Sequence, residues 1–211
     1  MIRAVISDFG GVLTTPLFES FIAYQRESGI GFEDLGAAMA RVAAAHDGEH
    51  PLFALEKGEL TEAEFIGRLE KELGRKMGPF RDTYCSHLHR NEPMIGYMRE
   101  LKGRGLRMAL LTNNVREWEP HWRAKLPDID EIFELVVDSA FVGMRKPERG
   151  IYELTLERLG LPAQACLFVD DTEPNCHTAT GLGMTAVHFR DTDQALAEIG
   201  AALDGGPPPT H

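Results

Sequence analysis

Cysteines are few in this chain of 211 residues, and long apolar runs are absent. The three cysteines, Cys85, Cys166 and Cys176, are odd in number and form no CxxC pair, so we expect neither a disulfide framework nor a zinc site. No apolar stretch approaches the roughly 18 residues of a transmembrane helix, and the N-terminal residues lack the pattern of a cleavable secretory signal. We therefore expect a cytoplasmic protein without a membrane partner.

Basic residues are also in short supply, since 22 Lys and Arg stand against 33 Asp and Glu and give a formal charge of -11. Broad binding to a nucleic acid or to an anionic membrane needs a basic patch, so the composition argues against both partners. A small acidic substrate stays compatible with it, because a few local cations can override the charge of the whole chain. The length allows one sizeable core, or a core with a smaller inserted domain, and leaves the oligomeric state open.

The N-terminal stretch combines an apolar strand with a carboxylate and a turn. Residues 2–6 predict a buried strand, and Asp8 comes where this strand should end. Gly10 and Gly11 follow, a pair that can adopt turn geometries closed to other residues. In open parallel α/β sheets, ligands bind outside the carboxyl ends of the strands. Taken alone these residues also fit a simple strand and turn, and the later motifs favour a site at Asp8.

Residues 15–90 show helical periodicity, and nothing in them clearly indicates a strand. The spacing of apolar residues predicts helices around 18–25, 35–45, 52–57, 61–73 and 79–89. Thr61 and Glu64 form a capping box at the start of the fourth. Because this block follows the Asp8 loop, we expect it to lie above the strand ends as a lid.

From residue 92 onward, helices and strands alternate. The predicted strands are 106–111, 132–137, 166–169 and 185–188, and the predicted helices are 92–103, one through Trp118 and Trp122, 148–159, a short one after 171, and 193–203. Such alternation with short loops predicts right-handed βαβ units and a parallel sheet with helices on both faces. The last residues are rich in Gly and Pro and are expected to be disordered.

Polar residues of complementary chemistry fall at the predicted strand ends or in the loops between them. They are Asp8, Thr112, Lys146, Asp170, Asp171 and Asn175. Displacement at a phosphoryl group needs a carboxylate nucleophile, a hydroxyl donor, a fixed ammonium group and carboxylates that hold a divalent cation. Mg²⁺ is the cation expected with such oxygen ligands. Each signal alone also fits a helix cap or a solvated turn, and only their order along one sheet edge indicates a site.

This order of motifs resembles the haloacid dehalogenase superfamily of hydrolases over essentially the whole chain. The resemblance is carried by 8–13 (DFGGVL), 110–113 (LLTN), 146–148 (KPE) with Tyr152, and 168–171 (FVDD) followed by Asn175. Segments 143–147 and 170–171 look most like the branch that includes the N-terminal phosphatase domain of soluble epoxide hydrolases. The resemblance implies an α/β fold with a Rossmann-like core at 1–14 and 91–204, an inserted helical cap at 15–90, and a tail at 205–211.

The resemblance also implies a Mg²⁺-dependent phosphohydrolase that acts on a small phosphorylated metabolite. Asp8 would be the nucleophile that forms an aspartyl-phosphate. Thr112 and the main chain of Asn113 would hold phosphate oxygens, and Lys146 would steady the nucleophile and the transferring group. The expected metal ligands are Asp8, the carbonyl group of Gly10, and Asp171. Asp170 and Asn175 would support these ligands.

Gly10 departs from the family pattern. Phosphatases of this family usually carry a second Asp two residues after the nucleophile, as acid for the leaving group and base for the hydrolytic water. Glycine transfers no proton, so we expect hydrolysis that is slow or that depends on a good leaving group. The sequence singles out no replacement among the acids and histidines of the predicted cap, which include His46, Asp47, Glu49, His50, Glu56, Glu59, His87 and His89.

Two other functions fit the same residues. A 2-haloacid dehalogenase also lacks the second Asp, because a halide leaves without a proton, but such enzymes need no metal, and Asp170 and Asp171 would repel a carboxylate substrate. A catalytically idle protein that binds Mg²⁺ and phosphate, or that serves as an interaction protein, would use the fold as a scaffold. The missing acid favours this idle protein, whereas the retained Asp8, Lys146 and Asp171, together with Thr112, disfavour it.

Overall fold

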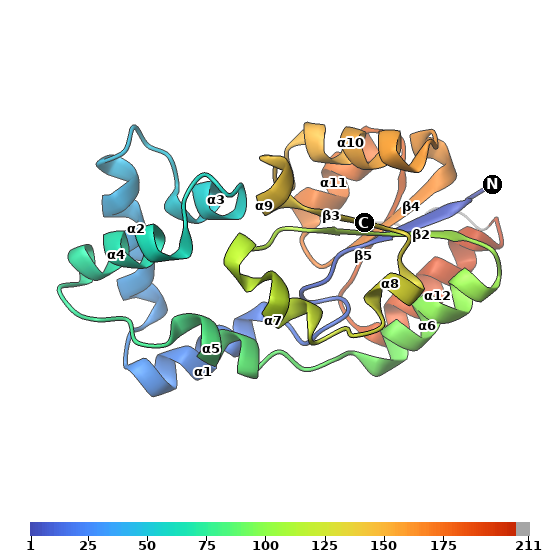
Figure 1. The fold of residues 1–211 in the computed structure, drawn as a ribbon. Coiled ribbons are helices and arrows are strands. Elements are labelled where there is room, and N and C mark those ends of the chain that lie inside the picture. Colours follow the sequence, from blue (N-terminus) through green and yellow to red (C-terminus); the bar gives the residue numbers. More distant parts are fainter. Residues whose placement is uncertain (206–211) are drawn as a thin grey trace.

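A five-stranded parallel sheet forms the centre of the fold (Figure 1). The structure is a computed structural model that describes residues 1–205, apart from the side chain of Leu17. The tail expected at 205–211 therefore lies outside the described residues, except for Gly205. The strands are β1 (Ala4–Ser7), β2 (Arg107–Thr112), β3 (Leu135–Asp138), β4 (Cys166–Asp170) and β5 (Thr185–His188), in the order β3-β2-β1-β4-β5.

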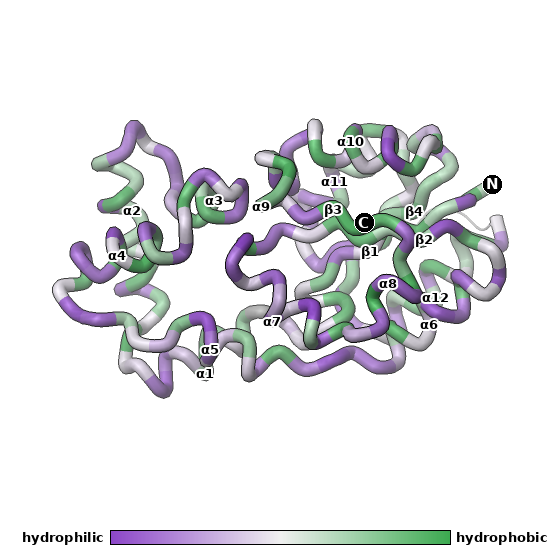
Figure 2. The backbone as a smooth tube through the Cα atoms, in the orientation of Figure 1, coloured by the Kyte–Doolittle hydropathy of each residue, from purple (hydrophilic) through white to green (hydrophobic). Residues whose placement is uncertain are grey.

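Helices cover both faces of this sheet (Figure 1). One face carries α6 (Glu92–Gly103), α8 (Ile129–Ile132) and α12 (Thr192–Leu203), and the other carries α10 (Arg149–Leu159) and α11 (Glu173–Gly181). Side chains alternate along β1, so Val5 packs with α6 and α12 whereas Ala4 and Ile6 pack with α10 and α11. The strands are accordingly hydrophobic along most of their length (Figure 2).

Five helices between residues 15 and 90 form what we call the helical block. They are α1 (Leu17–Ser28), α2 (Phe32–Ala44), α3 (Pro51–Glu56), α4 (Glu62–Leu73) and α5 (Phe80–Ser86). The chain enters and leaves the block through two segments that lie side by side, where the main chain of Thr15 donates to His89 (2.8 Å) and that of Asn91 donates to Leu13 (2.9 Å). The block lies beyond the end of the sheet opposite the N-terminus (Figure 1).

Most predicted helices and strands are present, with their ends shifted by a few residues, and two differ more. The predicted strand at 132–137 begins only at Leu135, because Ile132 is the last residue of the short helix α8 and residues 133–134 are irregular. The helix expected through Trp118 and Trp122 is divided into a 3₁₀ turn, η1 (Arg116–Trp118), and α7 (Glu119–Arg123). Pro120 sits in the first turn of α7, where its missing N–H is tolerated. Two elements too short for periodicity to reveal are α9 (Ser139–Val142) and η2 (Ala163–Ala165).

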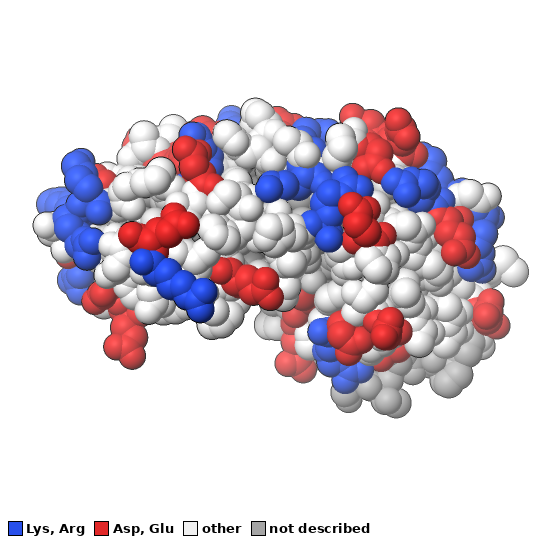
Figure 3. Space-filling model, turned by 90° about the horizontal axis from the view of Figure 1, so that it is seen from below, with Lys and Arg blue, Asp and Glu red and all other residues white. Residues whose placement is uncertain are grey.

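All three cysteines are buried with free thiols. Within residues 1–205, every helix is too short or too polar to cross a membrane. On the face shown in Figure 3, basic and acidic side chains lie in mixed groups that are separated by uncharged surface. Many of the charges at the protein surface are therefore paired locally.

The capping box predicted at the start of α4 is confirmed, and it generates a stability prediction. Thr61 Oγ1 accepts from the main chain of Glu64 (3.2 Å), and Glu64 Oε2 accepts from the main chain of Thr61 (2.9 Å). Thr61→Ala removes this cap and should lower the free energy of unfolding by about 1 kcal/mol in urea denaturation. Gly67→Ala, at an exposed position with open space around the added methyl group, should raise it by up to about 1 kcal/mol. A Thr61→Ala midpoint at or above that of the wild type would contradict the role of this cap.

Candidate active site

Three neighbouring strands end at one edge of the sheet and bring their polar residues together. Asp8 follows β1, Thr112 is the last residue of β2, and Asp170 is the last residue of β4. The main chain of Asp8 donates to the carbonyl oxygen of Val169 (2.9 Å), which extends the pairing of β1 with β4. The parallel register therefore fixes two carboxylates beside each other. This is the arrangement that the order of motifs predicted.

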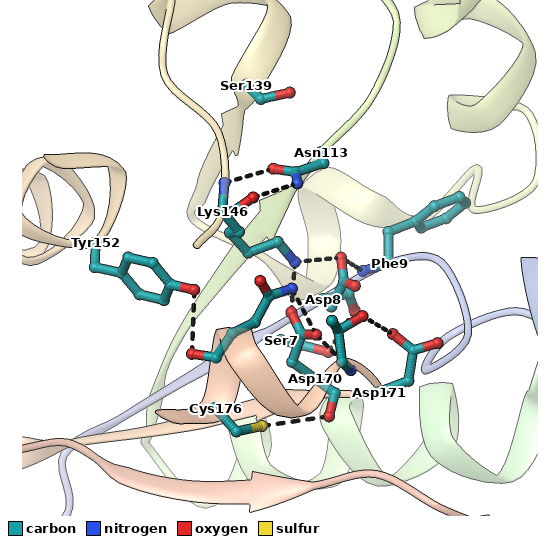
Figure 4. Close-up of polar contacts among 12 residues, drawn as sticks. Ser7, Asp8, Phe9, Asn113, Ser139, Lys146, Tyr152, Asp170, Asp171 and Cys176 are labelled. Atoms are coloured by element: carbon teal, nitrogen blue, oxygen red, sulfur yellow. Dashed lines mark hydrogen bonds and ion pairs between the residues drawn. The ribbon is translucent and has the colours of Figure 1, made fainter. Parts of the chain in front are cut away.

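Lys146 lies between these two carboxylates (Figure 4). Its Nζ is 2.8 Å from Asp8 Oδ1 and 2.6 Å from Asp170 Oδ2, and only 1% of its side chain is exposed. A buried ammonium group is tolerated only when it is paired and hydrogen-bonded, and here two carboxylates provide this. These carboxylates hold the pKa of Lys146 above its usual value although burial opposes them. Lys146 is therefore a fixed positive charge beside Asp8.

Asn113 fixes the main chain of Lys146. Its side-chain oxygen accepts from the main-chain nitrogen of Lys146 (2.8 Å), and its Nδ2 donates to the carbonyl oxygen of the same residue (2.9 Å). The family resemblance implied phosphate binding only for the main chain of Asn113. Its side chain has this separate positioning role, which no signal in the sequence indicates because the two residues are 33 positions apart.

Asp170 is fully occupied by partners within the protein. Its Oδ2 binds Lys146, and its Oδ1 accepts from the main chain of Thr172 (2.9 Å) and from Asn175 Nδ2 (2.9 Å). The carbonyl oxygen of Asn175 accepts in turn from the hydroxyl group of Tyr152 (3.1 Å). Asp170 and Asn175 are thus placed to orient the site, with little capacity left for a ligand.

Asp171 has more freedom and lies near the other carboxylates. One oxygen each from Asp8, Asp170 and Asp171 lie within 4.8 Å of one another. Asp171 accepts one hydrogen bond from the side chain of Thr172 (3.3 Å). Gly11 approaches it so closely that a Cβ there would overlap Asp171 Oδ2, and its φ of +79° also favours glycine. The turn after β1 therefore brings its main chain against Asp171.

Carboxyl groups outnumber ammonium groups at the site. Burial raises the pKa of Asp8 to about 8, with Lys146 opposing this rise and Asp170 and Asp171 adding to it. Burial and then Asp170 raise the pKa of Asp171. Three close carboxyl groups with a single ammonium group are best satisfied by an added cation. Oxygen donors alone favour a hard cation such as Mg²⁺, so the residues present fit the metal that the sequence analysis expected.

A cavity of about 410 Å³ opens over these residues. From the sheet side it is lined by Asp8, Gly10, Thr112, Asn113, Lys146, Asp171 and Asn175, and from the helical block by Phe53, Glu56, Tyr84, Cys85 and Leu88. Trp118 and Trp122 add apolar surface between them. The sequence did not place the aromatic residues, Arg145, Cys85 or Leu88 at the site, and it did not single out Glu56, because the position of these residues depends on how distant segments pack.

Fold and site together define an α/β protein with a carboxylate-rich cavity at the strand ends. A family model described as haloacid dehalogenase-like hydrolase matches residues 2–183. The chain therefore belongs to the haloacid dehalogenase-like hydrolase family, as its motifs predicted.

The proteins similar in sequence differ in length, so the match covers very different shares of them. It is 29% identical over 210 residues to acyl-CoA dehydrogenase family member 10 of Mus musculus, covering 95% of this chain but only 19% of that protein. It is 27% identical over 210 residues to sesquiterpene phosphatase astK of Aspergillus oryzae, covering 93% of this chain and 94% of that protein. It is 25% identical to bifunctional epoxide hydrolase 2 of Sus scrofa, covering 94% and 38%. The last match agrees with the branch that the sequence resembles.

A solved structure of similar fold is a haloacid dehalogenase family enzyme from Bacteroides thetaiotaomicron, in complex with magnesium and inorganic phosphate. The TM-score is 0.70 with 21% sequence identity, and the match covers 89% of this chain and 93% of the other. At 21% sequence identity, this similarity establishes that the two proteins share a fold and nothing more.

Lys146→Met tests the charge balance of the site. The substitution leaves buried carboxyl groups without their cation and should lower the free energy of unfolding by about 3–5 kcal/mol in EDTA at neutral pH. Lys71→Met, at an exposed position, is the matched control and should change it by less than about 0.5 kcal/mol.

The same variant should also change how stability depends on pH. Because folding raises the pKa of Asp8 from 3.8 to about 8, the folded protein keeps a proton that the unfolded chain releases, and stability falls as pH rises through this range. The wild type should level off near pH 8, whereas Lys146→Met, with a still higher Asp8 pKa, should continue to fall. In urea denaturation, the free energy of unfolding of Lys146→Met should lie further below that of the wild type at pH 9 than at pH 7. An equal difference at the two pH values would contradict the raised pKa of Asp8.

Proposed function

We propose that the protein is a Mg²⁺-dependent phosphohydrolase that acts through an aspartyl-phosphate at Asp8 on a small phosphorylated metabolite. The observation that carries the proposal is the position of Asp8. It lines the cavity, its Oδ1 lies 2.8 Å from the ammonium group of Lys146, and it shares a cluster of carboxylates with Asp171. A carboxylate held in this way can attack a phosphorus atom while positive charge offsets the phosphate.

Two comparisons support this proposal. A relative that matches almost the whole chain is named a sesquiterpene phosphatase, and an enzyme of the same fold was solved with magnesium and inorganic phosphate. We infer the general class of substrate from them, a phosphate ester, and leave its organic part undefined. We also propose that residues 15–90 act as a cap over a core of 1–14 and 91–204, and that the protein works in the cytoplasm.

Each residue of the site has a role in this proposal. Asp8 is the nucleophile, Lys146 orients it and stabilises the transferring group, and Thr112 with the main chain of Asn113 donates hydrogen bonds to phosphate oxygens. Mg²⁺ would be held by Asp8, the carbonyl group of Gly10, and Asp171. Asp170 and Asn175 would support these ligands. When bound, Mg²⁺ would supply charge that lets an anionic carboxylate approach an anionic phosphate.

The same site disfavours the two alternatives. A 2-haloacid substrate carries its own carboxylate, which the cluster of Asp8, Asp170 and Asp171 would repel. An idle binding protein has no need for a buried ammonium group in contact with the nucleophile, since removing water from these charges costs free energy. Neither alternative explains Lys146 as well as phosphoryl transfer does.

The direct test is hydrolysis of p-nitrophenyl phosphate, whose good leaving group needs no proton. We expect turnover that requires Mg²⁺, stops in EDTA, and falls by about 10³-fold or more in Asp8→Asn. Asp204→Asn, an exposed position, is the matched control and should keep wild-type activity. Absence of turnover above that of Asp8→Asn would overturn the proposed function, and halide release from a 2-haloacid would then establish the dehalogenase instead.

Gly11→Ala tests the metal site separately from catalysis. The added methyl group would overlap Asp171 Oδ2, so it must displace a proposed metal ligand. We expect the affinity for Mg²⁺, measured by calorimetry, to fall by about 10–100-fold, as for other changes that move a ligand. Gly96→Ala in α6, where the methyl group meets open space, should leave the affinity unchanged. Equal affinities of the two variants would contradict the assignment of Asp171.

A further inference from the structure

One carboxyl group in the cavity has no role in the chemistry described above. Of the described residues that line the cavity, three carry carboxyl groups, namely Asp8, Asp171 and Glu56. The first two are the proposed nucleophile and metal ligand. Glu56 is the last residue of α3 and reaches the cavity from the helical block. The other acids and histidines that the sequence offered as replacements for the missing acid do not line this cavity.

Contacts with the sheet side hold Glu56 in a defined position. Its Oε2 accepts from Arg145 Nε (2.6 Å), and its carbonyl oxygen accepts from Ser139 Oγ (2.6 Å). The guanidinium group of Arg145 also stacks on the ring of Phe53, 3.9 Å from its centre. No described residue hydrogen-bonds to the second carboxyl oxygen, Oε1. One oxygen is therefore anchored while the other is available to a proton and a substrate.

The environment of Glu56 favours proton transfer. Burial raises its pKa, against the opposing effects of Arg145 and Lys146, and a raised carboxyl pKa brings an acid closer to neutral pH. The other titratable side chains that reach the cavity from the block are less suited. Burial raises the pKa of Cys85 to about 11 and that of Tyr84 far above its usual value. Histidine is absent from the described lining of the cavity.

We propose that Glu56 is the general acid and base that Gly10 cannot provide. This inference rests on the proposed phosphatase function. In the first step, an oxygen of Asp8 bonds to phosphorus, the bond from phosphorus to the leaving oxygen breaks, and Glu56 gives that oxygen its proton. In the second step, a water molecule attacks the phosphorus and passes a proton to the Glu56 carboxylate. The bond from phosphorus to Asp8 breaks, which releases phosphate and restores both side chains.

The kinetics of Glu56→Gln with two substrates of different leaving group test this role. With an alkyl phosphate such as butyl phosphate, whose leaving group needs a proton, kcat should fall by about 10²–10⁴-fold. With p-nitrophenyl phosphate the first step needs no acid, so the variant should release one p-nitrophenol per enzyme in a burst, followed by slow turnover. The burst arises because only the second step, which needs the base, is impaired. Gly10→Asp added to Glu56→Gln should restore part of the activity on butyl phosphate.

Control variants separate chemistry from folding. Glu59→Gln, an exposed acid three residues away that pairs with Lys57 (3.0 Å), should behave as the wild type. Glu56→Asp keeps a carboxyl group and should retain more butyl phosphate activity than Glu56→Gln. The role of Glu56 would be overturned by unchanged kinetics in Glu56→Gln, or by equal losses on both substrates without a burst. It would also be overturned if the wild type were inactive on butyl phosphate. A wild type inactive on p-nitrophenyl phosphate would instead overturn the proposed function itself.

Discussion

The buried contact of Lys146 with Asp8 and Asp170 is the interaction on which the rest of the site depends. Each charge alone would be costly to remove from water, and together they are tolerated because the distances are 2.8 and 2.6 Å. The contact is possible only because β1 and β4 are neighbours in the sheet and because Asn113 holds the main chain of Lys146. The sheet order is thus directly linked to the position of the proposed nucleophile.

A surplus of carboxylate distinguishes this site from a structural ion pair. Lys146 pairs with two of the three carboxyl groups, those of Asp8 and Asp170, and Gly11 lets the turn after β1 lie against the third, Asp171. Among the described residues, the sheet side therefore offers the proposed nucleophile, a cation and the proposed metal ligands, but no further carboxyl group that lines the cavity and could protonate a leaving oxygen. The helical block contributes a carboxyl group, that of Glu56, to the same cavity.

The sequence was sufficient to predict what depends on local pattern and motif order. The five strands, the long helices and the capping box at Thr61 follow from periodicity and local chemistry, and the gathering of Asp8 with Asp170 follows from parallel strands sharing an edge. The short helix α8 and the division before α7 were missed because such elements are too short to show a period. The side-chain role of Asn113 and the position of Glu56 depend on contacts between distant segments, which one sequence does not reveal.

Phosphoryl transfer to Asp8 is the step on which the proposed function depends, and it can be observed by trapping the phosphorylated enzyme. The enzyme is mixed with p-nitrophenyl phosphate and Mg²⁺, quenched in acid during turnover, digested and analysed by mass spectrometry. We expect a phosphoryl group on Asp8 that is lost on treatment with base, as is usual for an acyl phosphate. Turnover with no phosphoryl group on Asp8, or with the group on another residue, would contradict it.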